Sequence, residues 1–220
     1  MKRSFKTVVI RLALGVLLCH PHAAHAQKAP AIETLPVITK TRVAVSEGVF
    51  WGPLYVTIDG KERKIADEAI ESWIIQRGRQ VVYSGRDGAG GFENEGQSLR
   101  IYDARTGKHR KIMSEYVGVN KVTELTTSRN KTALIVDMSD GGLGASYLAV
   151  VDPSRGEVFF RRWAKMLSHR GDIIVIGHYK EDDWDKFLEN PNAKVAPYKT
   201  ERQNLNTILR RRVIFNKPDR

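Results

Sequence analysis

The feature that most constrains the fold is a turn signature that recurs along the chain. The segments IYDARTGKHRKI and AVVDPSRGEVFF each end an apolar run at an Asp, reach a Gly four positions later and begin a second run; YVTIDGKERKI does so with Asp59-Gly60. An Asp side chain accepts backbone N–H groups inside a turn, and Gly supplies the positive φ that lets a second strand return. Asp59, Asp103 and Asp152 follow one another at intervals of roughly 45 residues, which predicts one hairpin in each of three repeating units.

A second marker recurs in phase with the first. The segments RGRQVVYSG (77–85), RNKTALIVD (129–137) and RGDIIVIGH (170–178) each place Arg beside Gly or Asn and continue into a strongly β-forming run. Turn, inner strand, spacer, third strand, turn and fourth strand therefore repeat in order, which favours an all-β, β-propeller-like fold over a generic sandwich. About four blades are predicted, at 41–67, 72–114, 122–162 and 165–216.

The first and last predicted blades are irregular, so the ring is either a closed one of four blades or a partial one. Four is the lower limit for a closed propeller, and a partial ring has exposed edges that permit a homodimer. A short helical insertion is predicted near 182–190, with Asp182 or Asp183 as its cap and Asn190-Pro191 at its end. A final strand is predicted at 207–215, where pairing with 41–58 would close the ring.

The run Ser84-Gly85-Arg86-Asp87-Gly88, followed by the strand and turn at 99–108, resembles the repeat of the TolB-like, WD-repeat-type β-propeller family. The resemblance covers about 43–179, and the chain lacks the Ser-Pro-Asp-Gly entry to the inner strand that this family shows. What the resemblance implies is a propeller architecture. It implies almost nothing about function.

Residues 1–26 have the pattern of a secretory signal peptide: four basic residues, a short apolar run and an A-x-A site that predicts cleavage after Ala26. We expect 27–40 to be a linker and 41–220 a single domain. The apolar run is too short for a transmembrane segment, so the sequence predicts a periplasmic or secreted protein. Cleavage would remove Cys19 and lower the net charge from +11 to +7. This location disfavours nucleic acid as a partner, and the positive charge favours an anionic envelope surface.

Catalytic residues are not evident in the sequence. There is no G-x-S-x-G motif, and the mature chain would have no cysteine nucleophile. His109, His169 and His178 are scattered without metal-ligand spacing, and His109 is expected to be exposed on an outer strand. The sequence therefore favours a binding module over an enzyme and assigns no catalytic residue.

The best candidates for binding lie in two acidic, glycine-rich spacers, and they are Arg86, Asp87, Glu93, Asn94, Glu95 and Asp140. Oxygen ligands on such loops suit Ca²⁺, although neither spacer follows the D-x-[DN]-x-[DN]-G pattern. The sequence therefore predicts no cofactor and leaves Ca²⁺ as the alternative. Its candidate ligands are Asp87, Glu93, Asp137 and Asp140.

Together these patterns predict an exported binding or scaffolding module of the cell envelope. Its inter-strand loops at 85–97 and 139–145 would present a surface to a protein or glycan partner. The alternative is a calcium-dependent, carbohydrate-active or lectin-like domain that uses the acidic loops.

Overall fold

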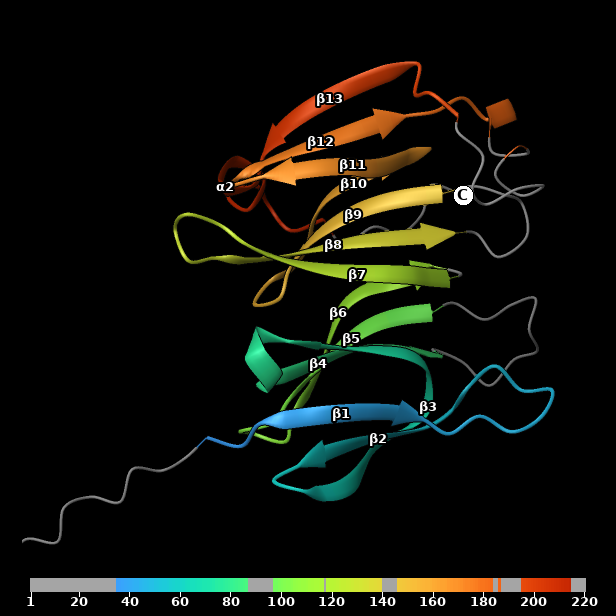
Figure 1. The fold of residues 1–220 in the computed structure, drawn as a ribbon, viewed down its shortest axis with the longest axis vertical. Coiled ribbons are helices and arrows are strands. Elements are labelled where there is room, and N and C mark those ends of the chain that lie inside the picture. Colours follow the sequence, from blue (N-terminus) through green and yellow to red (C-terminus); the bar gives the residue numbers. More distant parts are fainter. Residues whose placement is uncertain are drawn as a thin grey trace, which may run out of the picture. The chain divides into compact units, whose positions relative to one another are not determined.

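The computed structural model describes residues 35–86, 97–116, 118–139, 146–183, 186 and 195–214 (Figure 1). Three antiparallel sheets account for most of them, with strand orders β1-β2-β3-β4-β5-β6, β10-β9-β8-β7 and β11-β12-β13. The fold is all-β and β-propeller-like, as the sequence predicts. The predicted signal peptide at 1–26 lies outside the described residues.

Each sheet is built from strands that follow one another in the sequence. The first contains β1 (Ile38–Val43), β2 (Gly52–Ile58), β3 (Lys61–Ile75), β4 (Gln80–Arg86), β5 (Gln97–Asp103) and β6 (His109–Tyr116). The second contains β7 (Gly118–Thr126), β8 (Thr132–Ser139), β9 (Ser146–Asp152) and β10 (Gly156–Arg162). The third contains β11 (Ala164–Arg170), β12 (Ile173–His178) and β13 (Lys199–Asn204). The short helices are η1 (Gln76–Gly78) and α2 (Leu205–Ile208). No helix in the described ranges is long and apolar enough to cross a membrane.

Strand β3 joins two blades into the six-stranded sheet. Its residues up to Ala69 pair with β2, and those from Ala69 onward pair with β4. Blade one is therefore β1, β2 and the first part of β3, and blade two is the rest of β3 with β4 to β6. Blade three is the second sheet and blade four is the third sheet. These limits agree with the predicted blades except at the two ends. Strand β1 begins at Ile38, inside the predicted linker, and the third sheet ends at Asn204 instead of reaching 216.

The predicted turns are confirmed in atomic detail. The Asp103 carboxylate accepts the Thr106 backbone N–H at 2.9 Å and the Thr106 hydroxyl at 3.0 Å. Asp152 accepts the Ser154 backbone N–H at 2.8 Å in the same way. The glycines that complete these two turns have φ values of 66° and 121°. Two of the three predicted turns are thus hairpins capped by their Asp side chains, and the Asp59-Gly60 turn has positive φ at both residues.

The core consists of apolar clusters between successive blades, and β8 shows how they arise. Successive side chains of a strand point to opposite faces. Leu134 and Val136 pack with blade two, whereas Ala133 and Ile135 pack with blade four. All four of these side chains are fully buried. A strand of almost continuous apolar residues is therefore required in the middle of the stack of blades.

The predicted strand at 207–215 is wrong for its described residues, 207–214. Asn204 caps α2 by accepting the backbone N–H groups of Asn206 and Thr207 at 2.9 and 3.3 Å. Leu205, Ile208 and Leu209 then bury their side chains in the cluster shared with blades three and four. This helical spacing and the cap outweigh the β propensity of the segment.

The chain after α2 lies against blade three rather than blade one. The Ile214 backbone N–H donates to the Glu157 carbonyl at 2.8 Å. Within the described ranges no strand of blade four pairs with blade one, so strand pairing does not close a ring there. Of the predicted helical insertion at 182–190, Asp182, Asp183 and Lys186 are helical, and the other residues lie outside the described part.

Candidate functional site

The candidate site is a row of polar side chains across three strands of blade two. Arg100 on β5 is paired with Tyr83 on β4 and with Lys111 on β6. In an antiparallel sheet, directly paired residues point their side chains to the same face. The next row pairs Tyr102 with His109, so a guanidinium, a phenol, an ammonium and an imidazole gather on one face.

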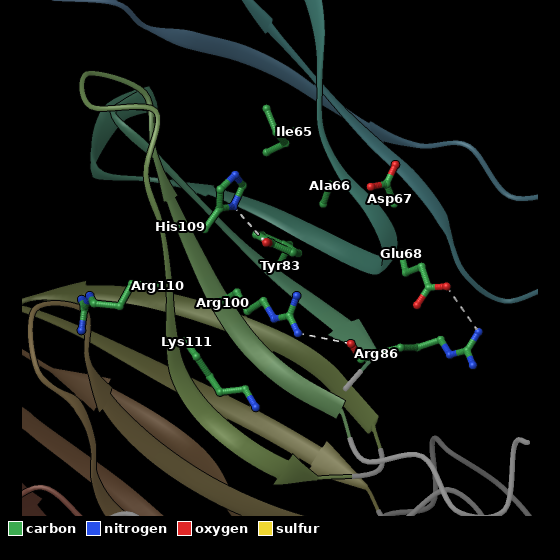
Figure 2. A pocket seen from close by; sticks show the side chains of 10 residues that line it. All are labelled: Ile65, Ala66, Asp67, Glu68, Tyr83, Arg86, Arg100, His109, Arg110 and Lys111. Carbon is green, nitrogen blue, oxygen red and sulfur yellow. Dashed lines mark hydrogen bonds and ion pairs between the residues drawn. The ribbon is translucent and has the colours of Figure 1, made fainter. Parts of the chain in front are cut away.

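These side chains line a hollow of about 560 Å³ (Figure 2). The first part of β3 forms its other wall. The lining residues are Ile65, Ala66, Asp67, Glu68, Tyr83, Arg86, Arg100, His109, Arg110 and Lys111. Figure 2 shows Arg110 pointing away from its strand on the side opposite to His109 and Lys111, as strand alternation requires.

Tyr83 and His109 form the best defined contact in the hollow. The Tyr83 hydroxyl lies 3.0 Å from His109 Nδ1, and the His109 ring packs against Tyr102 with ring centres 5.0 Å apart. Burial raises the pKa of Tyr83, and a hydrogen bond from Arg100 only partly offsets this rise. Burial, and then the Arg100 charge, lowers the pKa of His109. If neutral His109 accepts a hydrogen bond from the Tyr83 hydroxyl at Nδ1, its own proton is on Nε2.

Arg86 and Arg100 are held firmly beside this pair. Arg100 donates to the Ser98 hydroxyl at 2.9 Å and to the Arg86 carbonyl at 3.2 Å. The Arg86 guanidinium lies 3.8 Å from the centre of the Trp51 ring and 3.9 Å from a Glu68 carboxylate oxygen. Only 11% of the Arg86 side chain is exposed. Packing rather than solvent therefore sets the direction of both guanidinium groups.

The chemistry of the hollow is that of a hydrogen-bond donor surface. The wall formed by β4, β5 and β6 carries the guanidinium groups of Arg86 and Arg100, the Lys111 ammonium group and a neutral His109 ring. The acids of the hollow lie on the β3 wall. One of these acids, Asp67, is paired with Lys64 at 2.9 Å. Guanidinium groups bind carboxylates and phosphates through parallel hydrogen bonds. The arrangement therefore suits the binding of an anionic group.

The residues predicted from the sequence are distributed unevenly relative to this hollow. Arg86 lines it. The other candidates for binding, Asp87, Glu93, Asn94, Glu95 and Asp140, lie outside the described residues. Of the candidate calcium ligands, Asp137 alone lies within the described ranges, on β8 and away from the hollow.

Asp137 has surroundings that disfavour a cation. It is paired across β7 and β8 with Lys121. Burial raises the pKa of Asp137, and the charges of Lys121 and Lys165 only partly offset this shift. Burial likewise lowers the pKa of Lys165. Two ammonium groups beside this carboxylate oppose a divalent ion at its oxygens. No group of three or more His, Cys, Asp or Glu side chains that could hold a metal ion is found among the described residues.

The sequence interpretation missed Tyr83, Arg100, His109 and Lys111 as members of one site. It placed His109 exposed on an outer strand, which is confirmed because β6 is the edge strand of its sheet, but it did not connect His109 with the other three residues. The missing signal was available in the Asp103 turn, because a hairpin turn fixes the register of its two strands. From that register, Arg100 and Lys111 are predicted to share a face.

Comparison with known proteins gives likeness of fold only. No protein-family model and no curated protein matches the chain. The β-propeller domain of the Trilobed protease from Pyrococcus furiosus has a TM-score of 0.46 and 9% identity, over 77% of this chain and 57% of that one. Pyrococcus horikoshii acylaminoacyl peptidase has a TM-score of 0.45 and 11% identity, over 78% of this chain and 32% of that one. An acylaminoacyl peptidase in complex with Z-Gly-Gly-Phe-chloromethyl ketone gives 0.44 and 11%, over 77% and 32%.

The chain thus spans little more than half of the first of these structures and about a third of the other two. Membership of the TolB-like family remains a resemblance, because no family model matches.

Proposed function

We propose that this protein is a non-catalytic binding module of the cell envelope, and that the hollow on blade two receives an anionic group of a protein or glycan partner. The observation that supports it best is the row Tyr83–Arg100–Lys111. Strand register gives the row a fixed geometry. Its two cations, Arg100 and Lys111, would attract an anion.

A further observation supports binding rather than catalysis. The Tyr83 hydroxyl lines the hollow, and burial raises its pKa, so it is a poor nucleophile. The proposed location outside the cytoplasm is supported by the sequence pattern of residues 1–26 alone.

Binding is tested with an acidic trisaccharide, trigalacturonic acid, and its neutral counterpart maltotriose, by isothermal titration calorimetry. We expect the acidic sugar to bind and the neutral one not to bind. The Lys111→Gln variant should weaken binding about tenfold, which corresponds to about 1.4 kcal/mol for a lost charged hydrogen bond. Hexaglutamate and hexaglutamine provide the same comparison for a peptide partner.

The matched control is Lys199→Gln, which removes the same charge from an exposed position on β13, outside the residues that line the hollow. It should bind like the unaltered protein. Equal loss in both variants would mean that net charge, not this hollow, attracts the ligand. If EDTA removes binding and calcium restores it, the calcium-dependent alternative replaces this proposal.

A further inference from the structure

A second polar groove lies where η1 of blade two faces the turn between β7 and β8 of blade three. It consists of two adjoining hollows of about 710 and 340 Å³. Gln76, Asn130 and Thr132 line both hollows, so the two lie side by side. The groove runs from η1 in blade two, across the turn between β7 and β8, to the turn between β9 and β10.

The acidic and basic side chains of this groove differ in whether they have hydrogen-bond partners. Its two acids already have partners: Glu124 accepts the Gln76 backbone N–H, at 3.1 and 3.0 Å from its two oxygens, and Asp152 caps its own turn. In contrast, Arg77, Arg79 and Lys131 make no side-chain hydrogen bond or ion pair with any described residue. The available charge in the groove is therefore positive.

The backbone of the groove is held in an unusual conformation. Gln76, Arg77 and Gly78 have consecutive φ values of 51°, 55° and 84°, and Asn130 on the facing turn has 55°. Residues other than Gly rarely adopt this left-handed region, and those that do are concentrated at sites such as ligand clamps. The hydrogen bonds from Gln76 to Glu124 hold the turn in place. The backbone that carries Arg77 and Arg79 is thus held where both residues line the groove.

We propose that this groove binds an acidic, extended peptide segment of a protein partner. Carboxylates of the segment would pair with Arg77, Arg79 and Lys131. The amide and hydroxyl side chains of Gln76, Asn130 and Thr132 match the donors and acceptors of a peptide backbone. An acidic glycan fits less well, because sugar rings stack on aromatic side chains and no aromatic residue is among the described residues that line the groove.

The test measures binding of fluorescein-labelled hexaglutamate by fluorescence anisotropy, with hexaglutamine as the neutral probe. We expect the double variant Arg79→Gln/Lys131→Gln to weaken binding at least tenfold without a change in melting temperature, because both side chains are unpaired. The double variant Lys111→Gln/Arg110→Gln removes the same charge from blade two. It removes charge from the hollow on blade two only, so the binding of hexaglutamate in the groove should remain.

Three outcomes would overturn the proposal. Equal loss in the two double variants would mean that hexaglutamate senses net charge only. Binding that is lost in the blade-two variant alone would place the peptide in the other hollow, which leaves the function proposed above intact. Trigalacturonic acid that competes with hexaglutamate at equal concentration, and that is itself weakened by Arg79→Gln/Lys131→Gln, would make the ligand a glycan.

Discussion

The Asp172 carboxylate accepts the Ser128 backbone N–H at 2.7 Å, and this bond joins the inner turn of blade four to that of blade three. The second carboxylate oxygen accepts the Ser128 hydroxyl, and it accepts the Asn206 side-chain amide at 2.6 Å. One half-buried residue therefore connects two blades and α2. A carboxylate that accepts three hydrogen bonds contributes more to stability than an ordinary surface ion pair does.

We expect Asp172→Ala to lower the melting temperature clearly, because two donors of Ser128 and one of Asn206 lose their acceptor. The hydrogen bonds from Ser128 lower the pKa of Asp172 below its ordinary value of 3.8. The bonds therefore stabilise the fold above that pH, and the benefit is lost as the pH falls through the lowered pKa. Thermal melts of both proteins should differ at neutral pH and converge in strong acid.

Asp67→Ala is the control for this experiment. Asp67 is an exposed acid whose partner is Lys64, at 2.9 Å on the same strand. Exposed ion pairs contribute little to stability. A loss in Asp67→Ala as large as that in Asp172→Ala would show that the junction between blades has no special weight.

The second junction, between blades two and three, depends on Glu124. We expect Glu124→Ala to lower the free energy of unfolding by about 1–3 kcal/mol, because the part-buried Gln76 N–H then has no acceptor. Glu124→Gln keeps one acceptor oxygen and should cost less. Urea denaturation of the two variants gives the comparison, and an equal cost would mean that charge rather than the hydrogen bond matters.

The repeats could be predicted from the sequence because each marker acts locally. Asp103 and Asp152 cap their own turns, and the apolar runs that follow need only period-two alternation to form strands. The segment after Asn204 could not be predicted in this way. Its residues have β propensity, and their helical conformation depends on burial of Leu205, Ile208 and Leu209 against blades that lie far away in the sequence.

The hollow was only partly predictable for a related reason. Arg86 was identified from its place beside a glycine-rich spacer, which is a property of one segment. Arg100 and Lys111 become neighbours of Tyr83 only through the registers of β4, β5 and β6 together. The Asp103 turn sets the pair Arg100–Lys111, because the bulges in the pairing of β5 with β6 lie beyond it. No turn of this kind sets the register of β4 against β5, which are joined by the long spacer.

Two glycines with left-handed backbones should respond differently to alanine. A Cβ on Gly78, with φ of 84°, would lie 2.6 Å from the Ile38 carbonyl oxygen and 2.7 Å from Val37 Cγ1. A Cβ on Gly60, with φ of 76°, would meet nothing within 4 Å. Gly60→Ala should cost about 1–2 kcal/mol from backbone strain alone. Gly78→Ala should cost distinctly more in urea denaturation, because the start of β1 must move. Similar costs would mean that β1 is loosely attached to blade two.

The contact between Tyr83 and His109 predicts a pH dependence of stability. The pKa of His109 in the folded protein is lowered from 6.5, first by burial and then by the Arg100 charge. The unfolded chain therefore binds a proton more readily than the folded one as the pH falls below 6.5, and stability declines in that direction. The decline ends below the lowered folded pKa, where both states are protonated.

Replacement of His109 should remove this component. We expect His109→Gln to flatten the fall in unfolding free energy between about pH 7 and pH 5, the range in which an ordinary histidine titrates. His169→Gln, which keeps the Tyr83–His109 contact, should retain the fall. Urea denaturation across the range measures both variants, and an NMR titration of the His109 ring gives its pKa directly. A ring that titrates above 6.5 would show that Nδ1 donates to Tyr83, so that the hollow carries an additional positive charge.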